Sequence, residues 1–378
     1  MIIKNASVYT EDGRFLRKDI YIEGDVFAHD VEEVSDRTQI DAAGCFAIPG
    51  LTDIHFHGCV GHDFCDGTVA AISAMASYEA SVGVTNIVPA TMTLGEETLF
   101  DICRTAKAYV ETHSQEGKAR LYGINMEGPF VALSKKGAQN ADYVRKADIT
   151  MFDRLNEASG HMVKLLAIAP EEEGAMDFIE KKHGEVVLSL AHTAADYDTA
   201  ILAFEKGASH VTHMYNAMNP FTHRAPGLVG AAADTKKVEV ELICDGVHIH
   251  PAAVRATFNL FGDDRIILIS DSMMATGLED GDYSLGGQAV KVVGNLATLK
   301  DGTIAGSATN LMDCMRTAVL KMGIPMESAV KCAAVNPAKS VGIYDRCGSI
   351  TPGKRANVVL LQKEDLSLRQ VIVEGKPL

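Results

Sequence analysis

The sequence lacks the features of several common protein classes. No apolar run reaches the length of a membrane span, and the N-terminus, which begins MIIKN, has no basic region followed by a long apolar core. The eight cysteines are scattered and form no C-x-x-C pair, which is unlike a disulfide framework. We therefore expect a soluble, cytoplasmic protein with reduced thiols.

An excess of positive charge is also missing. The chain has 35 Lys and Arg against 50 Asp and Glu, so its formal net charge is -15. Nucleic acid and anionic membranes attract basic proteins, and we expect neither of them as a partner. An anionic substrate would need a local cluster of positive groups.

The glycine-rich phosphate loops G-x-G-x-x-G and G-x-x-x-x-G-K-[ST] are absent too. Helical patterns alternate instead with eight apolar, strand-like segments, at 51–57, 84–90, 121–127, 163–168, 185–191, 209–213, 239–244 and 265–271. Strands separated by helices form parallel sheets, and eight such units predict an α/β fold, a (β/α)8 TIM-like barrel. The alternative is a doubly wound open sheet, which normally carries a phosphate loop after its first strand.

Both ends of the chain are rich in strand patterns. Short strand-like pieces and turn signals fill residues 1–48, and residues 346–378 return to this pattern. We expect these two segments to pair into a small β-sandwich domain. Residues 49–345 would form the barrel domain.

Two histidines end the expected first barrel strand, in the sequence PGLTDIHFHG at 49–58. Because side chains alternate along a strand, His55 and His57 would point to the same side and could share a metal ion. Alone the pair is weak, since histidines at a strand edge are often ordinary surface or core residues. A rival pair, His248 and His250, lies beyond the expected seventh strand and fits this geometry less well.

Four further metal-competent residues end expected strands: Glu127, His192, His213 and Asp271. Each alone could be a helix cap or a satisfied core residue. Together they fall on the C-terminal rim, where barrel enzymes have their active sites, and charges there are costly unless they hold a metal ion or each other. Imidazole and carboxylate ligands suit a divalent metal ion; we expect zinc first, with iron, manganese or cobalt as alternatives.

A metal ion at this rim would activate a water molecule and polarise a carbonyl group. Asp271 would take the proton from that water and deliver it to a leaving amine, so the implied reaction is hydrolysis of an amide-like bond. The loop at 215–227 gathers amides and Arg224, and with His248 it could bind an anionic group. An ordinary surface loop is the alternative.

Several motifs resemble one family. They are PGLTDIHFHG (49–58), MEGPF (126–130), KKG (135–137), AHT (191–193), THMYNAM (212–218), DGVH (245–248), SD (270–271) and GSITPGKRAN (348–357). Over essentially its whole length the chain resembles the N-acetylglucosamine-6-phosphate deacetylases of the amidohydrolase superfamily. The resemblance implies hydrolysis of N-acetyl-D-glucosamine 6-phosphate, a small-molecule amino-sugar phosphate, to D-glucosamine 6-phosphate and acetate. The alternatives are the galactosamine isomer as substrate and a non-catalytic sugar-phosphate sensor.

The same resemblance implies roles for individual residues. The main metal ligands would be Glu127, His192 and His213, and Asp271 would be the catalytic acid and base at the metal. The retained His55 and His57 would allow one or two ions per subunit. The substrate would be bound by Asn216 and Ala217, by Arg224 and His248, and by a closing segment, Ile304, Ala305 and Gly306.

The resemblance also implies a homodimer, because in this family the arginine-bearing loop is thought to reach a neighbouring subunit. At one point the chain departs from the family. Some members have a histidine after the Lys-Lys-Gly turn that polarises the acetyl carbonyl, whereas Ala138 and Gln139 stand there in this chain. We place both among the substrate-binding residues; Gln139 could donate an amide hydrogen bond but cannot be a cation.

Overall fold

The computed structural model describes the whole chain, residues 1–378. Parallel strands form its centre, and all eight predicted strand segments are present, the third of them split in two. One sheet has the order β10-β9-β6 and the other runs from β11 to β16 in chain order. The strands are β6 (Leu51–Asp53), β9 (Val84–Ile87), β10 (Arg120–Leu121), β11 (Ile124–Met126), β12 (Val163–Ile168), β13 (Val187–Leu190), β14 (His210–Val211), β15 (Glu239–Ile243) and β16 (Ile266–Ile269).

Backbone hydrogen bonds join these two sheets on both sides. The amide of Asn125, on β11, donates to the carbonyl of Pro89, just beyond β9, over 2.9 Å. On the other side the amide of Asp271, just beyond β16, donates to the carbonyl of His55 over 2.9 Å. The parallel strands therefore curl until the first and the last lie side by side.

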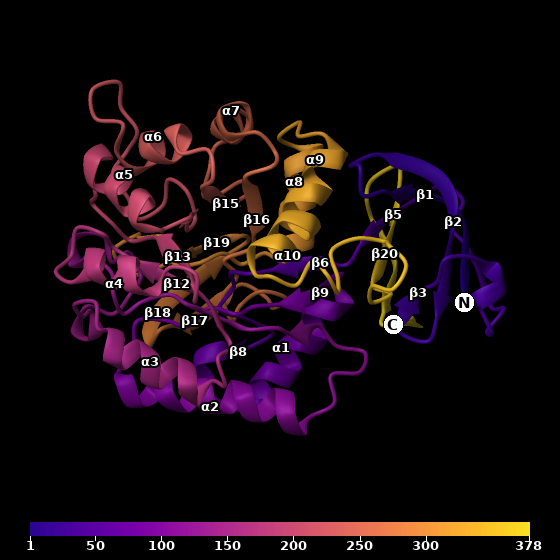
Figure 1. Ribbon diagram of the computed structural model, residues 1–378, viewed down its shortest axis with the longest axis horizontal. Helices are drawn as coiled ribbons and strands as arrows, with labels where there is room; N and C mark the ends of the chain where they lie inside the picture. The colour runs from indigo at the N-terminus through magenta and orange to yellow at the C-terminus, as the bar shows by residue number, and fades with distance from the viewer.

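Helices follow most strands, as the sequence predicted (Figure 1). They are α1 (Val69–Ser81), α2 (Glu96–Thr112), α3 (Ile149–Ala158), α4 (Ala175–Lys182), α5 (Tyr197–Lys206), α6 (Gly227–Asp234), α7 (Pro251–Phe261), α8 (Leu311–Leu320), α9 (Met326–Val330) and α10 (Asn336–Ser340). Helix α6 was not predicted, because its sequence GLVGAAAD has no polar face and so no helical periodicity. None of the helices combines the length and the apolar character needed to cross a bilayer.

The two ends of the chain share one mixed sheet, in which β20 pairs with β5 (Figure 1). Its order is β22-β21-β20-β5-β1-β2-β3, with β4 beside β1. The strands are β1 (Ile2–Tyr9), β2 (Phe15–Glu23), β3 (Val26–Phe27), β4 (Gln39–Asp41), β5 (Cys45–Pro49), β20 (Val358–Gln362), β21 (Leu368–Val373) and β22 (Lys376–Pro377). A separate hydrophobic core packs against this sheet. It contains Ile3, Val8 and Ile22 from one end of the chain and Val358 and Leu360 from the other.

Two smaller antiparallel sheets lie within the central part of the chain. The predicted hairpin region is a three-stranded sheet of β17 (Gly281–Leu285), β18 (Gln288–Val293) and β19 (Leu296–Thr298). A short hairpin, β7 (Gly58–Cys59) and β8 (His62–Asp63), follows the first parallel strand, β6. Together the elements make a mixed α/β fold around a curled parallel sheet.

The first parallel strand is shorter than predicted. β6 ends at Asp53, so His55 and His57 lie in the bend beyond it and strand alternation does not align them. The carboxylate of Asp53 accepts a hydrogen bond from the backbone amide of His55 over 3.1 Å, which turns the chain locally. The carbonyl of Ile54 is held by the side-chain amide of Asn125 instead of a neighbouring strand.

Gly50 joins β5 to β6, and the space beside it is filled. A Cβ atom at Gly50 would lie 2.2 Å from Oγ1 of the buried Thr85, on β9. We expect Gly50→Ala to lower the free energy of unfolding by about 1–3 kcal/mol, because overpacking forces the neighbouring strand to shift. Urea denaturation measures this change.

The matched control repeats Gly50→Ala in a Thr85→Ala background, where the clashing Oγ1 and Cγ2 atoms are gone. The cost of the alanine should then be smaller than in the wild-type background. An equal cost in both backgrounds would show that the contact with Thr85 is not its cause.

Candidate metal centre

Six buried side chains meet beyond the C-terminal ends of the parallel strands: His55, His57, Glu127, His192, His213 and Asp271. They are the six residues that the sequence predicted as metal ligands. Glu127 directly follows β11, while His55, His192, His213 and Asp271 each stand two residues after the end of a strand. The structure therefore brings the predicted set together from five different strands.

Three of these residues have a backbone that non-glycine residues rarely adopt. The φ angle is 44° at His192, 29° at His213 and 49° at Asp271. Such conformations cost on the order of 1–3 kcal/mol each and persist only where the surroundings fix them. They turn the chain sharply at the strand ends, and the three side chains point to one place.

Glu127, His192 and His213 form one group of possible ligands. The Nε2 atoms of His192 and His213 lie 3.0 Å and 3.1 Å from Oε1 of Glu127 and 3.2 Å from each other. The other ring nitrogen of His192, Nδ1, is 2.9 Å from the carbonyl oxygen of Lys135 and can only donate to it. Nε2 of His192 is therefore left with a lone pair that faces the group.

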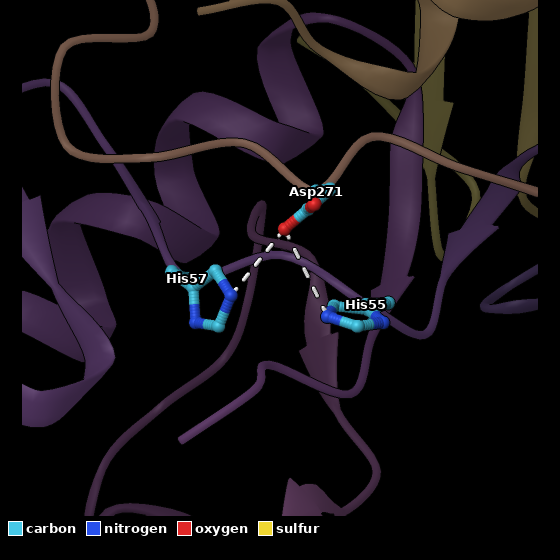
Figure 2. A group of neighbouring side chains, drawn as sticks. All are labelled: His55, His57 and Asp271. Atoms are coloured by element: carbon cyan, nitrogen blue, oxygen red, sulfur yellow. Dashed lines mark ion pairs between the residues drawn. The ribbon is translucent and has the colours of Figure 1, made fainter. Parts of the chain in front are cut away.

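His55, His57 and Asp271 form the second group, which Figure 2 shows with the carboxylate of Asp271 between the two rings. Oδ1 of Asp271 is 3.3 Å from Nε2 of His57 and 3.8 Å from Nε2 of His55. Nε2 of His55 is buried and has no hydrogen-bond partner. A buried nitrogen without a partner, aimed at two carboxylates, fits the role of a metal ligand.

Glu127 contacts both groups. Its Oε2 lies 3.2 Å from Nε2 of His57, and its Oε1 lies 3.5 Å from Nε2 of His55. Its carboxylate can therefore serve two neighbouring cations at once. The donor set of imidazole and carboxylate suits divalent ions such as zinc, iron, manganese or cobalt.

Opposite charges in the cluster stabilise one another although the groups are buried. Burial alone would raise the pKa of Glu127, but the charge of His55 and hydrogen bonds from His192 and His213 hold this pKa well below its usual value. Burial likewise disfavours a charged His57, yet its hydrogen bonds to Asp271 and Glu127 raise its pKa to about 10. The pKa of Asp271 is lowered, since His57 and His55 outweigh the effect of burial. Asp271 is thus an ionised carboxylate at neutral pH.

Gln139 is buried beside Glu127. Its side-chain Nε2 donates to Oε2 of Glu127 over 2.7 Å, and its Oε1 accepts from the backbone amide of Thr93 over 2.7 Å. Both ends of its amide are thus in use within the protein. Gln139 fixes the orientation of the Glu127 carboxylate as well as lining the space in front of it.

A cavity of about 390 Å³ opens onto the metal-ligand cluster. Seven of the predicted substrate-binding residues line it: Ala138, Gln139, Asn216, Ala217, His248, Ile304 and Gly306. Two do not: Ala305 is buried behind this wall, and Arg224 is exposed in the loop before α6. Unpredicted lining residues are Met92, Ser134, Lys135, Gly137, Leu285 and Thr303.

A signal was available for only some of these unpredicted residues. Lys135 belongs to the quoted Lys-Lys-Gly motif and is a positive charge in an acidic chain. Met92 and Leu285 are ordinary apolar residues whose position depends on how the β17 hairpin packs, which no local pattern shows. Glu241 was also passed over, although a glutamate inside the apolar strand β15 is a visible anomaly.

The rival histidine pair does not converge on a common point. Nδ1 of His248 is 2.7 Å from the carboxylate of Asp245, and this ring lines the cavity. His250 is exposed, and its Nδ1 accepts from the amide of Ala252 at the start of α7. Only His248 belongs to the site.

Comparison with known proteins places the chain in a family. A model of the amidohydrolase family matches residues 46–378. The N-acetylglucosamine-6-phosphate deacetylase of Bacillus subtilis (strain 168) is 34% identical and aligns with 96% of this chain and 90% of its own length. The N-acetylgalactosamine-6-phosphate deacetylase of Escherichia coli O157:H7 is also 34% identical, over 87% of this chain and 86% of its own.

A solved structure extends this similarity to three dimensions. The crystal structure of N-acetylglucosamine-6-phosphate deacetylase from Pasteurella multocida has a TM-score of 0.92 to this chain at 28% identity. The two match over 100% of this chain and 99% of that one. The chain belongs to the amidohydrolase family.

Proposed function

We propose that this protein is a metal-dependent enzyme that removes the acetyl group from N-acetyl-D-glucosamine 6-phosphate, giving D-glucosamine 6-phosphate and acetate. The observation that carries the proposal is the meeting of the two ligand groups beneath a cavity of about 390 Å³. The similarity to amino-sugar-phosphate deacetylases along 96% of the chain identifies the substrate class.

The enzyme uses a divalent metal ion, as its family and its ligand groups indicate. Glu127, His192 and His213 would hold the main ion, for which zinc is our first choice and iron, manganese or cobalt are alternatives. His55, His57 and Asp271 would hold a second ion, with Glu127 shared. A bound ion supplies an activated water at neutral pH and polarises the acetyl carbonyl.

Asp271 is the acid and base of the reaction. Its carboxylate is ionised, so it can take the proton from the attacking water and then pass it to the amine that leaves. Gln139 keeps the Glu127 carboxylate oriented, and with Ala138 it forms the wall beside the acetyl group. Ile304 and Gly306 also line the cavity, backed by Ala305.

The sugar phosphate binds at the positive side of the cavity. Burial disfavours a charged His248, but its hydrogen bond to Asp245 raises its pKa, which favours an imidazolium that can pair with a phosphate. Lys135, Asn216 and Ala217 line the same cavity and add donors. These groups supply the local positive cluster that an anionic substrate needs in a chain of net charge -15.

Arg224 lies outside the cavity of its own chain, on an exposed loop. This position suits a homodimer in which the loop of one subunit completes the phosphate site of the other. We infer that the enzyme is such a homodimer and acts in the cytoplasm.

We also infer a closed (β/α)8 barrel over residues 49–345. The hydrogen bonds on both sides of the curled sheet support closure, because they leave no free edge between the first and last strands. The sheet made by both chain ends supports a separate β-sandwich domain of residues 1–48 and 346–378.

The galactosamine isomer of the substrate is the second candidate, since the relative from Escherichia coli is as similar as the one from Bacillus subtilis. A non-catalytic sugar-phosphate sensor is the third. The sensor hypothesis predicts a different site from the enzyme hypothesis, because a sensor has no need of an ionised Asp271 within reach of two ligand groups.

The first test measures acetate release from both N-acetylated sugar phosphates, with and without a chelator. We expect release from the glucosamine substrate, its loss with chelator and its recovery when metal is restored. Asp271→Asn should lower kcat by about 10²–10⁴-fold, because the amide cannot accept the proton. The control Asp263→Asn removes a carboxylate that pairs with Lys331 far from the cavity, and it should keep full kcat. If neither sugar phosphate releases acetate after metal is restored, the proposed enzyme activity is refuted.

A second test counts metal ions. The double variant His55→Ala, His57→Ala should bind one ion fewer per chain than the wild type, because it loses two of the three residues of one ligand group. Elemental analysis after dialysis gives the stoichiometry. The control is His29→Ala, His113→Ala, which removes two exposed histidines. If the stoichiometry of the His55 and His57 variant equals that of the wild type, the proposal of a second ion at this group is wrong.

A third test uses pH. In the metal-free protein the pKa of His57 is raised to about 10, so at neutral pH an ion that binds there must displace a proton. The apparent affinity of the second ion should therefore rise between pH 7 and pH 9, by up to about tenfold per pH unit for each proton displaced. Competition with a chromophoric chelator measures it. An affinity that stays constant over this range would contradict the raised pKa.

A further inference from the structure

Glu241 is a carboxylate buried directly behind the metal-ligand cluster. It lies on β15, is 0% exposed, and its strand neighbours Val240, Leu242 and Ile243 are buried and apolar. A charged carboxylate in such surroundings is costly unless hydrogen bonds and opposite charges compensate for lost water. The groups that face it therefore indicate its role.

One oxygen of Glu241 faces both ligand groups. Oε2 accepts a hydrogen bond from Nδ1 of His55 over 2.9 Å and another from the backbone amide of His213 over 3.1 Å. The other oxygen, Oε1, lies 3.8 Å from Nε2 of the buried His210, whose Nδ1 is 2.9 Å from the hydroxyl of Ser189. Neither Lys nor Arg forms an ion pair with this carboxylate.

This contact decides which nitrogen of His55 faces the cluster. As a metal ligand His55 would be a neutral imidazole with one N–H, and an ionised carboxylate can only accept it, so that proton would stay on Nδ1. Nε2 would then offer its lone pair to the ion, and it is the buried nitrogen that lies 3.5 Å from Glu127 and 3.8 Å from Asp271. Without Glu241, the proton could move to Nε2 and block it as a ligand.

The same oxygen also fixes the backbone of the other group. His213 has a φ angle of 29°, in the left-handed region, and its amide is held by Oε2 of Glu241. Oε2 of Glu241 thus holds the side chain of His55, in the second ligand group, and the strained turn at His213, in the first.

We propose that Glu241 is a positioning residue of the metal centre, which holds His55 in the form that binds the second ion and couples the two ligand groups. The proposal rests on the two-ion site of the proposed function. Carboxylates that accept from the far nitrogen of a ligand histidine typically change metal affinity by about 10–100-fold when they are removed.

The test compares Glu241→Gln and Glu241→Leu with a control, Glu79→Gln. Glu79 is also 0% exposed, lies on α1 and has no hydrogen-bond partner, and burial raises its pKa well above the usual value, so its change replaces a buried neutral acid by an amide of the same shape outside the cluster. Affinities for Zn²⁺ at each site are measured by chelator competition on purified, metal-stripped protein. We expect the second ion to bind about 10–100-fold more weakly in Glu241→Gln and weaker still in Glu241→Leu. Glu79→Gln should match the wild type.

A merely structural carboxylate would give a different result. Its removal would lower the unfolding free energy of the metal-free protein and leave the affinity of the second ion unchanged, and this outcome would overturn the proposal. The glutamine variant keeps the shape of the side chain, so it tests charge and proton position even if the leucine variant does not fold.

A measurement on the wild type needs no folded variant. Nitrogen-15 NMR of the zinc-loaded protein, with His55 assigned by its absence in His55→Ala, should show the proton of His55 on Nδ1. A proton on Nε2 would overturn the proposal. Deacetylase activity is assayed separately: wild-type protein that releases no acetate refutes the enzyme, while a weakened second ion in Glu241→Gln would still support the positioning role.

Discussion

The carboxylate of Glu127 is surrounded by four imidazoles, and the active end of the protein depends on this contact. Its two oxygens lie within 3.5 Å of ring nitrogens of His55, His57, His192 and His213. Each histidine comes from a different part of the curled sheet or the bend after its first strand. Six buried polar groups can share this small volume only because negative carboxylates lie beside protonated, positive imidazoles. A divalent ion would take the place of those protons.

The polar groups behind the cluster are arranged to keep its ligands in place. Gln139 holds one oxygen of Glu127, the carbonyl of Lys135 holds His192, and Glu241 holds His55. These supports come from loops and strands far apart in the sequence. Hydrolysis at a metal centre requires ligands held within about 0.5 Å of the productive geometry, and these supports restrict how far the ligands can move.

Much of this arrangement was predictable from the sequence. Apolar strands alternating with helices predicted the parallel sheet, and the residues just after those strands predicted all six members of the cluster. The argument from strand alternation for His55 and His57 was wrong, since β6 ends at Asp53, whose carboxylate binds the local amide of His55 and the distant hydroxyl of Ser270. The cavity wall from β17 depends on packing between distant segments, which no local pattern shows. Helix α6 has no polar face to give a helical period, and the glutamate inside apolar β15 was a signal that the prediction did not use.

The pairing of β5 with β20 has a consequence for how the chain is made. Cys45 and Gln362, which face each other across these strands, are 317 residues apart. On a ribosome, β5 emerges long before its neighbour exists, so one edge of the first sheet stays open while the whole central segment is translated and folds. The N-terminal strands can form only an incomplete layer at that stage, and β20, β21 and β22 complete it later.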